Sequence, residues 1–124
     1  MQITIKATNI ELTSAIRDYV NKRFNSVGKF VQKEGTEALC RVEVGKVTNR
    51  HKKGEVFSAE ARIHVRGKEL YVSSEKEDLY VAIDDVKDEL IRELQSTKEK
   101  KMNMMRRGGA KIKNMLKGLY DWGK

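Results

Sequence analysis

Hydrophobic and polar residues alternate along four stretches of the chain, which is the period of a half-buried β-strand. The predicted strands are residues 3–7, 38–47, 57–65 and 69–73. The third is the most regular, because every second residue from Phe57 to Val65 is apolar. A charged loop at residues 48–54 and a tight Gly67-Lys68 connection join the last three strands, which predicts a meander.

Two further stretches place apolar residues three or four positions apart, which predicts amphipathic helices with one buried face. The first begins after Thr13, a suitable N-cap, and ends at Gly28, while the second begins near Glu77. The apolar positions are Ala15, Ile16, Tyr19, Val20, Phe24 and Val27 in the first helix and Leu79, Ile83, Val86, Leu90 and Leu94 in the second. The order of elements predicts an α+β fold, β-α-β-β-β-α, with two helices packed on one face of a four-stranded, mostly antiparallel sheet.

Positive charge is concentrated at the C-terminal end of the chain. Of the net charge of +8, the last 27 residues supply +7, because nine Lys and Arg there face two acidic residues. The first 97 residues are nearly neutral, with 17 basic and 16 acidic residues. Such an unmatched cluster attracts a polyanion, either the phosphates of a nucleic acid or an anionic membrane surface.

The sequence predicts a protein of the cytoplasm. No stretch approaches the ~20 apolar residues that span a bilayer, and the opening MQITIKATNI has no cationic start followed by an apolar run. We therefore expect neither a membrane span nor a signal peptide. Cys40 is the only cysteine, and its apolar neighbours favour a small buried hydrophobe in a reducing compartment.

The titratable residues argue against an enzyme. His51 lies in the charged loop and His64 on the outward face of the third strand, and no second His or Cys stands at metal-ligand spacing from either. Acidic residues are scattered without a paired acid and base, and Gly108-Gly109 follows a helix, unlike a phosphate-binding loop. We expect no catalytic site, no metal, no cofactor and no small-molecule substrate.

Few aromatic residues are placed to stack on bases. Tyr71 is the only one expected to face outward from a strand. Readers of single-stranded RNA usually stack bases on several aromatic side chains. Recognition of a folded RNA through its phosphates therefore fits this chain better.

Residues 78–84, Asp-Leu-Tyr-Val-Ala-Ile-Asp, form the most specific motif of the chain. The motif resembles the ribosome hibernation promoting factor family, which includes the ribosome-associated inhibitor called protein Y. Residues 1–20, 41–48 and 61–65 are similar to the first helix and three strands of the same family. The resemblance covers residues 1 to about 101 and implies the fold predicted above.

The resemblance implies a bacterial, noncatalytic protein that binds the small ribosomal subunit. Members of this family bind in the channel of the messenger RNA and transfer RNAs and inhibit translation in stationary phase or under stress. Their partners are ribosomal RNA and, in addition, ribosomal proteins. By match of position, the RNA-binding residues are Lys22, Lys29, Arg92, Lys98 and Lys101, with Lys87 as a further candidate, and the unmatched basic run adds Lys100, Arg106 and Arg107.

Two positions of the second helix depart from the family pattern. Glu89 stands where relatives usually carry Lys, and Ser96 stands near another such position. We therefore expect a weaker RNA contact in the middle of this helix, with its C-terminal end compensating.

The chain divides into a ribosome-binding domain (1–101), a basic hinge (102–109) and a basic amphipathic tail (110–124). The tail is too short for the second domain with which long family members join two ribosomes, so the chain resembles the short type. An alternative function stays open: general RNA binding, or binding of an anionic membrane or a protein partner through the tail. A basic end can also have no specific partner and only add nonspecific affinity for polyanions.

Overall fold

The computed structural model describes residues 1–35, 37–47, 54–65 and 67–107, the last ten of them by their backbone. The strands are β1 (Gln2–Thr8), β2 (Ala38–Val47), β3 (Val56–Val65) and β4 (Lys68–Lys76). The helices are α1 (Ser14–Lys33), between β1 and β2, and α2 (Leu79–Arg107), after β4. The order β-α-β-β-β-α predicted from the sequence is confirmed.

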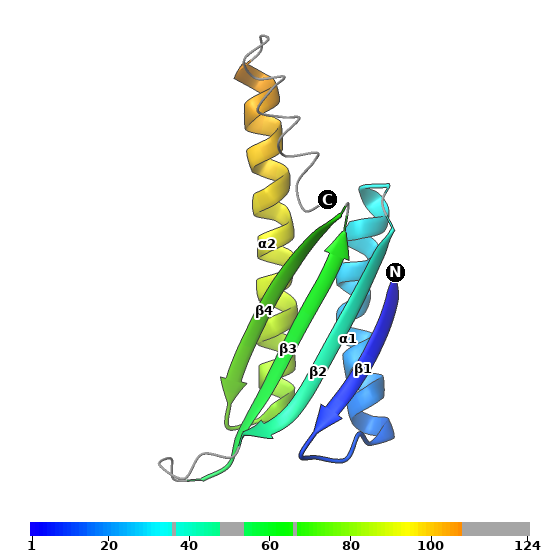
Figure 1. The fold of residues 1–124 in the computed structure, drawn as a ribbon, viewed down its shortest axis with the longest axis vertical. Helices are drawn as coiled ribbons and strands as arrows, with labels where there is room; N and C mark the ends of the chain where they lie inside the picture. The colour runs from blue at the N-terminus through cyan, green and yellow to red at the C-terminus, as the bar shows by residue number, and fades with distance from the viewer. Residues whose placement is uncertain (36, 48–53, 66, 108–124) are drawn as a thin grey trace.

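The four strands form one sheet in the order β1-β2-β3-β4. β1 and β2 are parallel, because α1 carries the chain back along the sheet between them, and the other two pairings are antiparallel. Cys40 of β2 lies beside Ile3 on one side and Ile63 on the other. Both helices cover one face of this sheet, and the opposite face is left without a helix (Figure 1).

The core lies between the sheet and the helices. Phe24, Ile63, Ile83 and Leu90 are among its largest fully buried side chains. Cys40 is also fully buried, as predicted, and desolvation raises the pKa of its thiol to about 12, because burial disfavours the charged thiolate. No polar or charged residue is buried among the residues that the structure describes, so the core is held by apolar contact.

Helix α1 is longer than the sequence predicted. It does not end at Gly28 but runs to Lys33, because Val31 in the added turn is 2% exposed and packs into the core. A glycine inside a helix is unfavourable by about 1 kcal/mol, which is less than the gain from burying a Val side chain. The helix ends where Gly35 adopts a φ of +69°, and its N–H donates to the carbonyl oxygen of Gln32.

The predicted buried stripe of α1 also needs one correction. Ala15 is exposed, whereas Ile16, Val20, Phe24 and Val27 are buried as predicted. Ala15 lies a full turn before Tyr19 on the side that turns away from the sheet. Its small apolar side chain costs little when it is left in water.

Helix α2 begins at Leu79, two residues after the predicted start. The Asp78 side chain accepts a hydrogen bond from the Tyr80 N–H at 2.8 Å, and the Asp78 carbonyl accepts from the Ala82 N–H at 3.1 Å, so Asp78 acts as the N-cap. The helix continues through residues 102–107, which were predicted to belong to the basic hinge. The predicted bend at Gly108-Gly109 and the tail lie outside the described residues, as do His51 and its loop.

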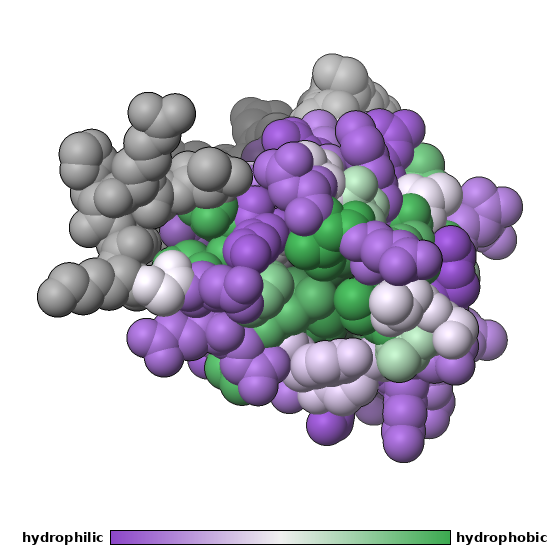
Figure 2. All heavy atoms as spheres, turned by 90° about the horizontal axis from the view of Figure 1, so that it is seen from below, coloured by the Kyte–Doolittle hydropathy of each residue, from purple (hydrophilic) through white to green (hydrophobic). Residues whose placement is uncertain are grey.

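The two ends of the molecule differ. At the end where both helices begin, hydrophobic side chains gather between hydrophilic ones (Figure 2), and Tyr80 and Val81 are 38% and 48% exposed. At the other end, α2 extends beyond the sheet (Figure 1). In the described part of the chain, no helix is both long and apolar enough to cross a membrane.

Candidate nucleic-acid interface

The exposed side of α1 is basic. The helix carries five basic residues, Arg17, Lys22, Arg23, Lys29 and Lys33, against one acidic residue, Asp18. Lys22 and Lys29, both predicted to bind RNA, are exposed and lie on the side opposite the buried stripe. Neither forms an ion pair with a residue that the structure describes. Both ammonium groups are therefore available to a phosphate.

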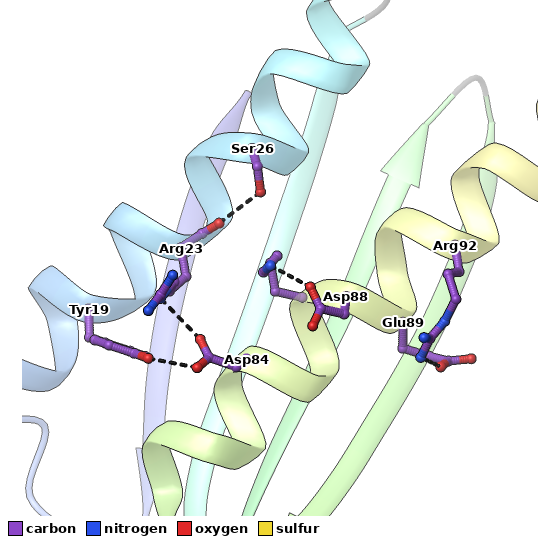
Figure 3. Close-up of polar contacts among 8 residues, drawn as sticks. Tyr19, Arg23, Ser26, Asp84, Asp88, Glu89 and Arg92 are labelled. Carbon is purple, nitrogen blue, oxygen red and sulfur yellow. Dashed lines mark hydrogen bonds and ion pairs between the residues drawn. The ribbon is translucent and has the colours of Figure 1, made fainter.

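A cluster of four side chains, Tyr19, Arg23, Tyr80 and Asp84, joins α1 to α2. The Tyr19 hydroxyl donates a hydrogen bond to Asp84 Oδ2 at 2.8 Å, and Arg23 Nε lies 3.1 Å from Asp84 Oδ1 (Figure 3). The Arg23 guanidinium is also 5.1 Å from the centroid of the Tyr19 ring, and the Tyr19 and Tyr80 rings meet edge to face at 4.8 Å. We call this set the helix-bridging cluster.

The pKa of the Arg23 guanidinium is raised above its ordinary value. The main cause is the side-chain interaction with Tyr19, followed by the negative charge of Asp84. Arg23 is not among the RNA-binding residues predicted from the sequence. The only local signal was the family motif, which includes Tyr80 and Asp84.

The two basic residues in the first part of α2 are paired with carboxylates. Lys87 forms an ion pair with Asp88, and Arg92 forms one with Glu89 (Figure 3). The pKa of Arg92 is raised, first by the hydrogen bond and charge of Glu89 and then by the charges of Asp85 and Asp88. An RNA phosphate would have to compete with these carboxylates for either cation.

The basic residues in the last part of α2 follow Leu94, the last buried residue of this helix among the side chains that the structure describes. They are Lys98, Lys100, Lys101, Arg106 and Arg107, and Glu99 is the one acidic residue among them. The structure places all five on one continuous helix, in the part that extends beyond the sheet (Figure 1). Lys98 and Lys101 are three positions apart and therefore lie on the same side of the helix backbone.

The open face of the sheet is mixed in charge. Arg62 stacks over the ring of Tyr71, 4.6 Å from its centroid, and forms an ion pair with Glu69 at 3.7 Å. Lys6 is paired with Glu43 at 3.9 Å. Tyr71 faces outward, as predicted, and is 47% exposed. One aromatic ring covered by a guanidinium does not form a base-stacking platform.

The described residues contain no group of three or more His, Cys, Asp or Glu that could hold a metal ion. His64 lies exposed on the open face of the sheet, as predicted. The candidate interface is a surface of exposed cations on the helices. Such a surface can bind phosphates and fix the orientation of a partner.

Residues 3–102 match the family described as Sigma 54 modulation protein / S30EA ribosomal protein. The chain is 35% identical over 100 residues to a ribosome hibernation promoting factor of Klebsiella oxytoca, covering 81% of this chain and 96% of that protein. The factor of Escherichia coli strain K12 is 32% identical with the same coverage. The factor of Pseudomonas putida is 31% identical over 112 residues, covering 90% of this chain and all of that protein.

Two solved structures share the fold. The N-terminal domain of Thermus thermophilus Protein Y superposes with a TM-score of 0.65 at 29% identity, covering 77% of this chain and 98% of that domain. A ribosomal subunit interface protein from Coxiella burnetii superposes with a TM-score of 0.60 at 16% identity, covering 80% of this chain and 99% of that one. At that identity, the second match supports the fold alone.

Proposed function

Because this chain belongs to the Sigma 54 modulation protein / S30EA ribosomal protein family, we propose that it is a noncatalytic cytoplasmic factor that binds ribosomes and inhibits translation. The relatives that it resembles are named ribosome hibernation promoting factors, which supports a role in stationary phase or under stress. We further propose that it binds the small subunit, in the channel of the messenger RNA and transfer RNAs. Occupation of that channel would itself prevent translation.

The observation that carries the proposed contact is that two exposed lysines of α1 have no carboxylate partner among the described residues, whereas Lys87 and Arg92 of α2 each have one. Lys22 and Lys29 on α1 are exposed without a carboxylate partner in the described structure, and the five basic residues at the end of α2 face one acidic residue. RNA phosphates bind such groups by displacing condensed counterions. Phosphate contacts fix the position of a protein on RNA without reading its sequence.

The cations in the first part of α2 have a smaller role in this proposal. Arg92 and Lys87 are each held by a neighbouring carboxylate. Glu89 also stands where relatives usually carry Lys, and its negative charge repels phosphate. We therefore expect the middle of α2 to contribute less to RNA binding than its C-terminal end. Lys98, Lys100, Lys101, Arg106 and Arg107 then supply most of the contact from this helix.

Sucrose-gradient sedimentation of a stationary-phase lysate tests the proposed function. The protein should migrate with ribosomal particles, and purified protein should inhibit translation in a cell-free extract. A protein found only in the soluble top fractions, or one that leaves translation unchanged, contradicts the proposal.

Two double variants with the same change of charge show which surface is used. Lys22→Ala with Lys29→Ala removes two cations from α1, and Lys6→Ala with Arg41→Ala removes two from the open face of the sheet. The first pair should weaken binding to small subunits by about one order of magnitude, since each lost phosphate contact reduces the counterion release. The second pair should change binding little. Equal losses would contradict binding through the helical face.

A further inference from the structure

Asp84 lies in the acidic first part of α2, and its carboxylate contacts two side chains of the basic helix α1. Its side chain, 37% exposed, lies at the junction of the two helices. Oδ2 accepts the hydrogen bond from the Tyr19 hydroxyl, whereas Oδ1 is buried and forms an ion pair with Arg23 Nε without an aligned hydrogen bond. One carboxylate thus holds two side chains of α1.

Arg23 is oriented by two contacts on different sides of its guanidinium. Nε faces the Asp84 carboxylate, and the planar group lies over the Tyr19 ring. The guanidinium has five N–H donors, and its Nε is the nitrogen that lies 3.1 Å from Asp84 Oδ1, so the ion pair does not occupy the terminal nitrogens. The Arg23 side chain is 47% exposed, so these nitrogens are accessible from solvent. A guanidinium with both terminal nitrogens available matches the geometry of a phosphate group.

The neighbours of Arg23 continue the same surface. Lys22 precedes it and Ser26 lies one turn later on α1, where the Ser26 hydroxyl donates a hydrogen bond to the Arg23 carbonyl oxygen (Figure 3). Both residues are exposed. Arg23 therefore lies between the exposed lysines of α1 and the first turns of α2, where a phosphate backbone crossing both helices would pass.

We propose that Asp84 and Tyr19 are positioning residues that present the terminal nitrogens of Arg23 to an RNA phosphate, which makes Arg23 an additional RNA-binding residue. This inference rests on the proposed ribosome binding. It gives the helix-bridging cluster a role in recognition as well as in the packing of α1 against α2.

The charge of Asp84 makes the proposal testable, because it predicts whether replacing Asp84 with Asn strengthens or weakens RNA binding. Replacing Asp84 with Asn removes a negative charge from a surface that binds a polyanion, which by electrostatics alone strengthens binding. If Asp84 positions Arg23, the same substitution weakens binding, because the guanidinium is no longer held. The two accounts therefore predict changes in opposite directions.

The test compares Asp84→Asn with Asp85→Asn in the full-length protein, with purified small ribosomal subunits as the probe. Both variants make the same change of charge on adjacent residues of α2, but Asp85 lies on the side of Arg92. Asp84→Asn should weaken binding about tenfold, the effect of losing one charge-assisted contact. Asp85→Asn should bind as tightly as the wild type or more tightly.

Double variants then separate positioning from packing. Arg23→Ala should weaken binding by a similar factor and lower the salt slope of the dissociation constant by about one. Asp84→Asn combined with Arg23→Ala should bind no more weakly than Arg23→Ala alone. Arg23→Lys keeps the charge but has one nitrogen for both the carboxylate and the phosphate, so it should not restore the affinity.

Circular dichroism and the melting temperature report whether each variant is folded. A purely structural role for Asp84 predicts a lower melting temperature of Asp84→Asn with an unchanged salt slope, and this result would overturn the proposal. Unchanged or tighter binding by a folded Asp84→Asn protein would also overturn it, while leaving the proposed function intact. A wild-type protein that fails to bind small subunits would overturn both.

Discussion

The two parts of α2 have the same secondary structure but opposite charge and surroundings. Residues 79–94 pack on the sheet and carry five acidic and two basic residues, and both basic residues are in ion pairs. Residues 95–107 follow Leu94, the last buried residue among the described side chains of α2, and carry five basic residues against one acidic residue. The first part stabilises the fold and fixes α1, whereas the second is suited to a polyanionic partner. The balance of basic and acidic residues therefore changes along one helix, from net negative on the sheet to net positive beyond it.

The division also agrees with the helix macrodipole. Acidic residues near the start of a helix and basic residues near its end are each favoured by the partial charges of the backbone. This effect is confined to about one turn at each end, so it does not explain five basic residues over ten positions. The excess at the end of α2 therefore favours a role in binding.

The largest contrast between the two parts of α2 should appear in stability. Leu90→Ala removes a fully buried side chain and should lower the free energy of unfolding by about 2–5 kcal/mol. Ser96→Ala, an exposed substitution only six residues later, should change it by less than about 0.5 kcal/mol. Chemical denaturation followed by circular dichroism measures both values. Similar losses would show that the packed part of α2 extends beyond Leu94.

A smaller effect should follow from releasing a cation in the first part. Glu89→Gln removes the partner of Arg92 and should tighten binding to small subunits roughly threefold, because the guanidinium then competes with fewer carboxylates. Glu93→Gln is the matched control, since it removes the same charge from an exposed carboxylate that forms no ion pair with the described residues. If both substitutions tighten binding equally, general repulsion and not the pairing of Arg92 limits the contact.

Most of the fold could be predicted from the sequence, because strands and helices differ in the spacing of their apolar residues. The end of α1 could not be predicted locally. Gly28 is a plausible helix stop by its own preference, but Val31 finds a place in the core that only the assembled sheet provides. The end of the helix was therefore decided by tertiary packing and not by residue type.

The candidate interface could be predicted in part. Charge and the family motif select the exposed lysines, whose positions depend only on helix spacing. The helix-bridging cluster could not be found in this way, because Tyr19 and Asp84 are 65 positions apart in the chain. In the sequence, Arg23 looks like any other exposed arginine. Its orientation becomes visible only when α1 and α2 lie side by side.

The salt dependence of binding to purified small subunits tests most directly whether the basic end of α2 makes the RNA contact. Two double variants each remove two positive charges from α2: Lys98→Ala with Lys101→Ala, and Lys87→Ala with Arg92→Ala. The slope of the logarithm of affinity against the logarithm of salt concentration should fall by about two for the first variant and by less than about one for the second. Equal decreases, or a larger decrease for the Lys87 and Arg92 variant, would contradict the account.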